Sequence, residues 1–155
     1  MKFYRNLAII GLSVMSLSVN AMAAKSEKHA KRATELRQSV FKLTYSNMGP
    51  MGAMAKGKMP MDVAKIKKNS KRLVQLSKMM SDYFVVDMRK FDVETEALDK
   101  IWQDKDLFET KIKDLTVAAK NLHELAKKGD KAALKSAIGK VGQACGSCHD
   151  DFKKD

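Results

Sequence analysis

The chain contains few cysteine, proline and aromatic residues, and this composition limits the folds that it can adopt. Of its 155 residues only 2 are Cys and 2 are Pro, and aromatic residues make up 6%. Because strands favour aromatic and β-branched side chains, so few aromatics argue against a β-sandwich or a β-barrel. The length suits one domain. With 11 Met and 31% charged residues, the composition favours a globular all-α protein.

Acidic residues are also scarce beside basic ones. The chain has 30 Lys and Arg but 18 Asp and Glu, which gives a net charge of +12. Nucleic-acid binding needs a basic face that carries base-reading or stacking groups, and no such face is visible, so nucleic acid is excluded as a partner. The lysines look like solvated helix faces that could steer an acidic redox partner or an anionic surface. They are Lys65, Lys67, Lys68, Lys71, Lys78, Lys120, Lys127, Lys128 and Lys131.

The N-terminus has the pattern of an export signal. Lys2 and Arg5 precede an apolar run over residues 7–19, and Ala21-Met22-Ala23 follows with small residues at the cleavage positions. The run is short for a membrane span, although a permanent anchor is the alternative. We expect a signal peptide over residues 1–23, cleavage after Ala23, no membrane span in the mature chain, and a periplasmic protein over 24–155.

Apolar residues recur at helical spacing in the first half of the mature chain. The first predicted helix runs from residue 26 to about residue 48, where Gly49-Pro50 ends or kinks it. A loop or a loose extra turn then reaches Pro60. Asp62 is a candidate N-cap for a second helix over residues 63–80.

The second half repeats this pattern after a mixed linker over residues 81–103. Asp104 or Asp106 opens a third helix, and Gly129 ends it. Asp130 then caps a fourth helix that runs to the C-terminal region. Because short connections join helices of similar length, we predict an antiparallel four-helix bundle.

The clearest chemical motif is Cys145-Gly146-Ser147-Cys148-His149. The spacing C-x-x-C-H is the attachment signature of c-type haem, in which Cys145 and Cys148 form thioethers and His149 is the axial iron ligand. A thioredoxin-like dithiol is one alternative, but no βαβ pattern surrounds it. A zinc site is another, but it needs four ligands, and the other histidines, His29 and His123, lie far away in the sequence.

With these residues the chain resembles the cytochrome c′ family, whose haem motif also lies near the C-terminus of a four-helix bundle. Further matches are Arg37-Gln38, Ile101-Trp102 and Val141-Gly142 before Cys145. The resemblance implies one covalently attached haem c. It also implies that Arg37 binds a haem propionate, that Gln38 lies at the haem edge, and that Phe41 covers the distal side of a five-coordinate iron. The alternatives are a solvated Arg37 and a Phe41 that belongs to the core.

Phe41 carries the functional prediction. Related low-spin bundle cytochromes place a ligating Met at the corresponding position, and a phenyl ring cannot coordinate iron. An apolar lid offers no hydrogen bond to bound oxygen, so NO and CO should bind in preference. We expect NO buffering or detoxification, without enzymatic turnover because no distal acid–base group is visible. The resemblance also implies a homodimer through the first two helices. The alternative is a six-coordinate electron-transfer cytochrome with Met48 or Tyr45 as sixth ligand.

Three further features stay open at this point. Lys153 follows His149 by four residues, where family members often have Arg, so its role in the proximal pocket is doubtful. Trp102 is expected to pack near the haem edge or the end of the bundle, and plain core packing is the favoured alternative. The methionines between Met48 and Met61 could gather copper, although methionine is also an adaptable core filler.

Overall fold

Each long helix begins at a polar side chain that accepts a backbone N–H of its first turn. In the computed structural model, which describes residues 22–154, Ser26 caps α1, Asp62 caps α2, Asp104 caps α4 and Asp130 caps α5, at N···O distances of 2.9–3.2 Å. The helices are α1 (Glu27–Ala55), α2 (Val63–Tyr83), α3 (Lys100–Gln103), α4 (Lys105–Lys128) and α5 (Lys131–Phe152). The three predicted aspartate caps are confirmed, and of the two candidates for α4 it is Asp104, not Asp106, that forms the cap.

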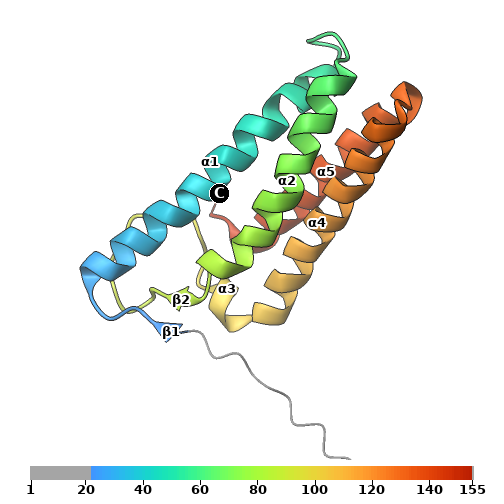
Figure 1. Ribbon diagram of the computed structural model, residues 1–155. Helices are drawn as coiled ribbons and strands as arrows, with labels where there is room; N and C mark the ends of the chain where they lie inside the picture. Colours follow the sequence, from blue (N-terminus) through green and yellow to red (C-terminus); the bar gives the residue numbers. More distant parts are fainter. Residues whose placement is uncertain (1–21, 155) are drawn as a thin grey trace, which may run out of the picture.

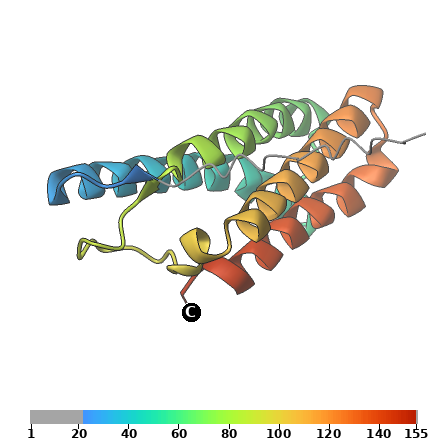
Figure 2. The same cartoon turned by 90° about the horizontal axis from the view of Figure 1, so that it is seen from below.

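The four long helices form the predicted antiparallel bundle. Neighbours pack in the cyclic order α1, α2, α4, α5, and Figure 2 shows α1 and α2 together on one side with α4 and α5 on the other. Gly129 ends α4 with a φ of 72°, a conformation that favours glycine, so that α5 turns back at once. The central core is formed by aliphatic side chains from all four helices, among them the fully buried Ile66, Leu122, Leu134 and Val141.

The end predicted for the first helix, near residue 48, is wrong. α1 continues through Pro50 to Ala55, and the connection to α2 shrinks to residues 56–62. Proline cannot supply the helical hydrogen bond, which disfavours this position. Continuation is nevertheless stabilised by packing, because Met51 and Met54 lie 0% and 3% exposed in the core. Because they are buried, Met51 and Met54 pack in the core and are not part of an exposed cluster that could bind copper.

The linker between α2 and α4 is ordered by contacts with the start of the chain. β1 (Met22–Ala23) pairs in parallel with β2 (Val86–Asp87), and Figure 1 shows the two strands side by side below α1 and α2. A small second core joins Ala30 and Ala33 of α1 to Met88. Residues 1–21 of the predicted leader lie outside the described residues, whereas its last two residues, Met22 and Ala23, form β1 and would be removed by the predicted cleavage after Ala23, which stays a prediction. Within residues 22–154, every helix is too short or too polar to cross a lipid bilayer.

Candidate functional site

The motif residues lie together near the C-terminal end of α5. Spacings of three and four residues place Cys145, Cys148 and His149 on neighbouring positions of one helix face. Cys145 and Cys148 are free thiols, half-buried against the central core, and His149 is exposed beside them. The helix therefore presents two thiols and one imidazole side by side, which is the donor set that covalent haem attachment requires.

The environment of the thiols argues against a redox dithiol. Burial raises the pKa of the Cys145 thiol and raises the pKa of Cys148 to about 11, where the neighbouring Cys145 adds to the effect and Lys111 opposes it. Reactive dithiols depend on a lowered pKa that maintains a thiolate at neutral pH. Raised thiol pKa values at both cysteines are the opposite of what a redox dithiol needs.

The zinc alternative finds no support either. In the part of the chain that the structure describes, no three His, Cys, Asp or Glu side chains are gathered as a metal site. His123 lies between α4 and α2, where its Nδ1 is 3.2 Å from the Ser70 hydroxyl and 3.1 Å from the Lys67 carbonyl. His29 lies in the first turn of α1, where its Nδ1 accepts the backbone N–H of Lys25.

A polar clamp holds the motif helix to its neighbours. Lys111 of α4 donates to the Ser147 hydroxyl at 2.6 Å and pairs with Asp151 at 2.9 Å. Lys100 of α3 pairs with the same carboxylate at 2.8 Å, and these two lysines hold the pKa of Asp151 below its ordinary value. These contacts could not be predicted from the sequence, because no motif or periodicity links residues that lie 36 to 51 positions apart.

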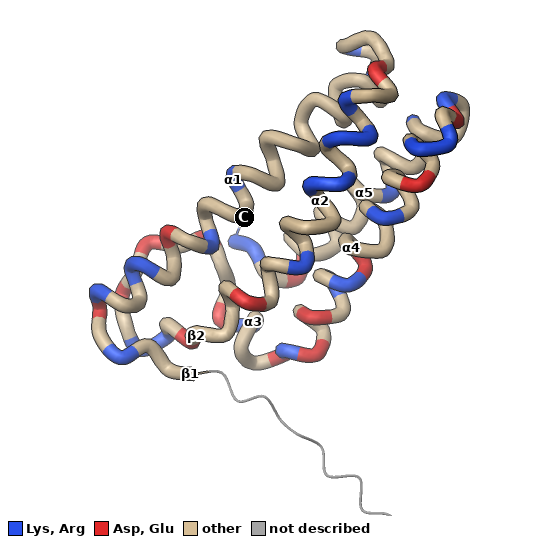
Figure 3. The backbone as a smooth tube through the Cα atoms, in the orientation of Figure 1, with Lys and Arg blue, Asp and Glu red and all other residues tan. Residues whose placement is uncertain are grey.

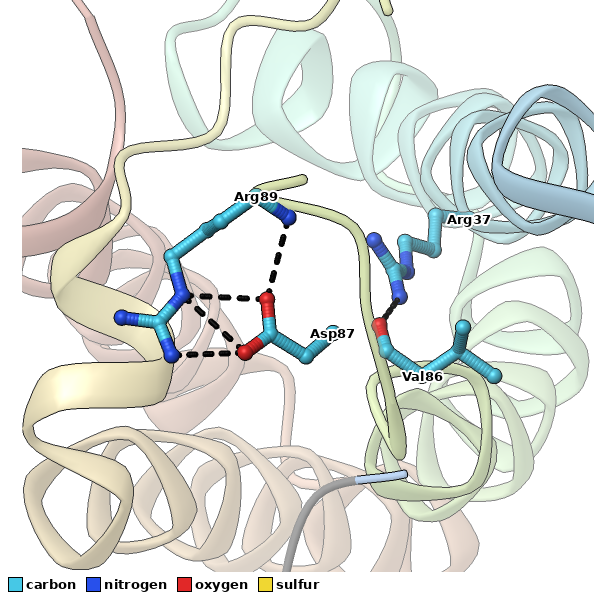
Figure 4. A network of polar contacts seen from close by, with 4 residues as sticks. All are labelled: Arg37, Val86, Asp87 and Arg89. Carbon is cyan, nitrogen blue, oxygen red and sulfur yellow. Dashed lines mark hydrogen bonds and ion pairs between the residues drawn. The ribbon is translucent and has the colours of Figure 1, made fainter. Parts of the chain in front are cut away.

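Arg37 is buried under the linker that follows α2. Only 3% exposed, it donates from Nε to the Tyr83 carbonyl at 2.7 Å, from Nη1 to the Met88 sulfur at 2.9 Å, and from Nη2 to the Val86 carbonyl. Figure 4 shows the guanidinium directed at Val86, while neighbouring Asp87 is occupied by Arg89. Burial lowers the pKa of Arg37 to about 10, against an opposing effect of Asp87.

Trp102 lies beside Arg37 with an unsatisfied donor. Its indole Nε1 is buried and has no hydrogen-bond partner among the described residues, and the Arg37 guanidinium lies 5.2 Å from its ring centre. A buried donor without a partner is unfavourable, which suggests that an acceptor is supplied from outside the chain. Three of the five guanidinium N–H groups of Arg37 are engaged, so a carboxylate could accept from both residues. These donors fit a haem propionate.

Phe41 lies one turn after Arg37 and is 40% exposed, which argues against an ordinary core role. Its ring meets Phe84 edge to face at 6.0 Å, and the contact continues through Phe108 to Phe152, three residues after His149. A continuous row of aromatic rings thus joins α1 to the motif helix.

The other predicted residues have different surroundings. Gln38 is exposed on α1, and Tyr45 is 77% exposed. The Met48 methyl lies against α5 near Gly142, one turn before Cys145. Lys153 ends α5 and pairs with Glu96 of the linker at 2.8 Å, so its side chain is held by the linker. A role for Lys153 in the proximal pocket stays a prediction.

Comparison with known proteins decides the family. A family model described as "Cytochrome C'" matches residues 32–153. The chain belongs to the cytochrome c′ family. Cytochrome c′ from Cereibacter sphaeroides is 39% identical over 94% of this chain and 95% of its own length. The structure of cytochrome c prime from Shewanella frigidimarina has a TM-score of 0.74 and 39% identity, over 81% of this chain and 97% of that one.

Membership of the cytochrome c′ family implies a covalently bound haem c, and the C-x-x-C-H motif supplies the residues that attach it. Another similar structure is the nitric oxide complex of a variant of cytochrome c prime from Alcaligenes xylosoxidans. It has a TM-score of 0.70 and 31% identity, over 81% of this chain and 96% of that one. Cytochrome c-556 from Rhodopseudomonas palustris is also similar, at 28% identity over 94% of this chain and 95% of its own length.

Proposed function

We propose that this protein is a periplasmic, high-spin c-type cytochrome that binds NO and CO reversibly and disfavours oxygen. One haem c, attached at Cys145 and Cys148 with His149 as axial ligand, supplies an iron atom with one free position for a diatomic gas. The biological role is buffering or removal of NO by binding, without catalytic turnover. Phe41 is the observation that carries the proposal, because a phenyl ring at the distal position cannot coordinate iron.

The surroundings of Phe41 support selectivity for gases that need no hydrogen bond. Its ring contacts another aromatic ring, Phe84, and neither can donate a conventional hydrogen bond. Bound oxygen is polar and is stabilised by a distal donor, whereas NO and CO depend on one much less. The solved nitric oxide complex of a related cytochrome c prime supports NO as the ligand.

The polar end of the site supports a fixed orientation of the haem. The Arg37 guanidinium lies 5.2 Å from the ring centre of Trp102, whose indole N–H has no partner among the described residues, and a propionate that reached both residues would satisfy these donors. Gln38, exposed on the same helix, lies one residue from Arg37 at the predicted haem edge. The Arg37 contacts to Val86 and Tyr83 hold the guanidinium in place before a propionate arrives.

Met48 supports the second candidate, a six-coordinate electron-transfer cytochrome. Its methyl group lies against the motif helix near Gly142, one turn before Cys145, and coordination by its sulfur would require distortion of α1. Tyr45 is directed at solvent and is the weaker candidate. In this reading the excess of lysines steers an acidic redox partner.

Optical and EPR spectra of the purified holoprotein, ferric and ferrous, separate the two candidates. We expect a high-spin signal, binding of CO and NO, and no stable complex with oxygen. A low-spin spectrum unchanged by CO would overturn the gas-binding proposal. In that case replacement of Met48 by Leu should restore a high-spin signal if Met48 is the sixth ligand.

A further inference from the structure

The net charge of the molecule is concentrated in one half of the bundle. We define the turn half as residues 42–72 and 117–140, which contain the α1–α2 and α4–α5 connections at the same end (Figure 1). These residues include 14 Lys and Arg but only 3 Asp and Glu. The remaining described residues, the haem half, contain 14 of each. The turn half therefore carries the whole net charge of residues 22–154.

The basic side chains of the turn half are mostly without acidic neighbours. Of the six ion pairs among the described residues, only Lys127–Glu124 lies in the turn half. The other two acidic residues there, Asp62 and Asp130, are the N-caps of α2 and α5. Figure 3 shows blue gathered on α2 and α4 towards the turns, whereas red and blue alternate at the opposite end. The positive potential of this half is thus available to a partner.

The chemistry of the turn half indicates the kind of partner. Thirteen of its basic residues are lysines, whose compact charge suits a diffuse anionic surface better than pairing at fixed angles. Protein interfaces are usually centred on Trp, Tyr or Arg, and the turn half has only Tyr45 and Arg72 of these types. At the α1–α2 loop, Met59 is 38% exposed next to exposed Lys58. An apolar side chain beside a flexible cation suits the interface of a membrane.

We infer that the turn half binds the surface of membranes that contain anionic phospholipids. Along α5, Cys145 lies 14 residues after Lys131, which is about 21 Å at the rise of an α-helix. A bundle bound by its turns therefore holds the haem-attachment site away from the lipid. The haem half, with a net charge of zero, then faces the solvent, where dissolved gases and soluble proteins reach it.

Vesicle co-sedimentation of the holoprotein tests this inference. The probes are vesicles of phosphatidylcholine alone and with about 30% phosphatidylglycerol, at low salt and at about 0.2 M NaCl. We expect binding only to the phosphatidylglycerol vesicles, weakened by salt. The combined change Lys58→Gln, Lys68→Gln and Lys128→Gln should weaken binding roughly 100-fold, since each lysine near an anionic surface contributes roughly fivefold.

A matched control variant removes the same charge from the haem half. Lys28→Gln, Lys90→Gln and Lys113→Gln alter exposed lysines that form no ion pair among residues 22–154, and this variant should bind as the parent does. Equal weakening of both variants would overturn the inference, because net charge alone would then explain binding. Absence of vesicle binding at low salt would also overturn the inference. If polyglutamate binds the turn half and the vesicles do not, the surface is assigned to an acidic protein.

Discussion

At the scale of single residues, Phe41 and Arg37 show how one helix turn separates two chemistries. Arg37 is buried and donates to the backbone carbonyls of Tyr83 and Val86, whereas Phe41 keeps 40% of its surface exposed and packs against the ring of Phe84. Hydrogen bonds therefore hold the polar residue in place, whereas the apolar residue is held by ring packing alone among the contacts described above. Both residues can be tested separately.

Replacement of Phe41 by Met should convert the haem to a six-coordinate form. A thioether is a known axial ligand, so we expect a low-spin ferric spectrum, and a competing bond worth about 1.4 kcal/mol would weaken CO binding about tenfold. CO titration of the ferrous protein measures this effect. Phe41→Leu is the matched control and should stay high-spin. A high-spin spectrum from the Met variant would place Phe41 away from the iron.

Asp151 should contribute stability that is lost in acid. Hydrogen bonds from Lys100 and Lys111 lower its pKa in the folded protein below the ordinary value of 3.8. A carboxylate with a depressed pKa stabilises the fold above its unfolded pKa, and this contribution disappears as the pH falls through the folded pKa. Asp151→Asn should therefore lower the thermal unfolding midpoint at pH 6. Below about pH 4 the midpoint of this variant should decrease less steeply with falling pH than that of the parent. Thermal unfolding followed by circular dichroism over this pH range measures both effects.

The neighbouring Asp150 supplies the control for this prediction. It is exposed on α5 and forms no salt bridge among the described residues. In Asp150→Asn the thermal midpoint should decrease with falling pH in the same way as in the parent. If the two variants behave alike, the clamp at Asp151 makes no specific contribution.

At the scale of elements, α1 shows packing prevailing over local preference. Pro50 lacks the N–H of a helical hydrogen bond, yet the helix continues for five residues beyond it, to Ala55. The two buried methionines of that extension, Met51 and Met54, explain why. The opposite situation holds at the N-termini of the helices, where Asp62, Asp104 and Asp130 act locally as the pattern predicts.

Pro50→Ala should stabilise the protein, because it restores a backbone donor inside α1. The expected gain in the free energy of unfolding is at most about 3 kcal/mol, the difference between the two residues in a helix interior. Urea unfolding of the holoprotein measures it. Pro60→Ala, in the loop before α2, is the control and should give no gain, since proline there restricts the unfolded chain. A loss of stability in Pro50→Ala would mean that a bend at proline is required for packing.

At the scale of the whole molecule, exposed apolar residues gather on α1. Leu36 and Leu43 are 42% and 53% exposed, and their seven-residue spacing places them on one face. Such a face is consistent with the proposed homodimer through the first two helices. Leu43 belongs to the turn half and Leu36 to the haem half, so this apolar face crosses the boundary between the two halves.

Leu43→Lys should weaken the proposed dimer. Loss of a buried leucine and introduction of a charge would cost at least about 1.5–3 kcal/mol at an interface, which raises the dissociation constant tenfold or more. Sedimentation velocity over a concentration series measures the effect. Val117 is an exposed residue of α4, so Val117→Lys adds the same charge away from α1 and α2 and should leave the association unchanged. A parent that is monomeric at all concentrations would contradict the dimer.

Local chemistry in the sequence determined much of this protein. The C-x-x-C-H motif, the aspartate caps and Gly129 depend on neighbours within a few residues, so the haem motif and most helix limits could be predicted. Tertiary structure alone decided what depends on distant partners. Burial of Met51 extended α1, and the linker enclosed Arg37 and left the Trp102 indole without an acceptor. Antiparallel folding also brought the lysines of four helices to one end, because the chain reverses direction between them.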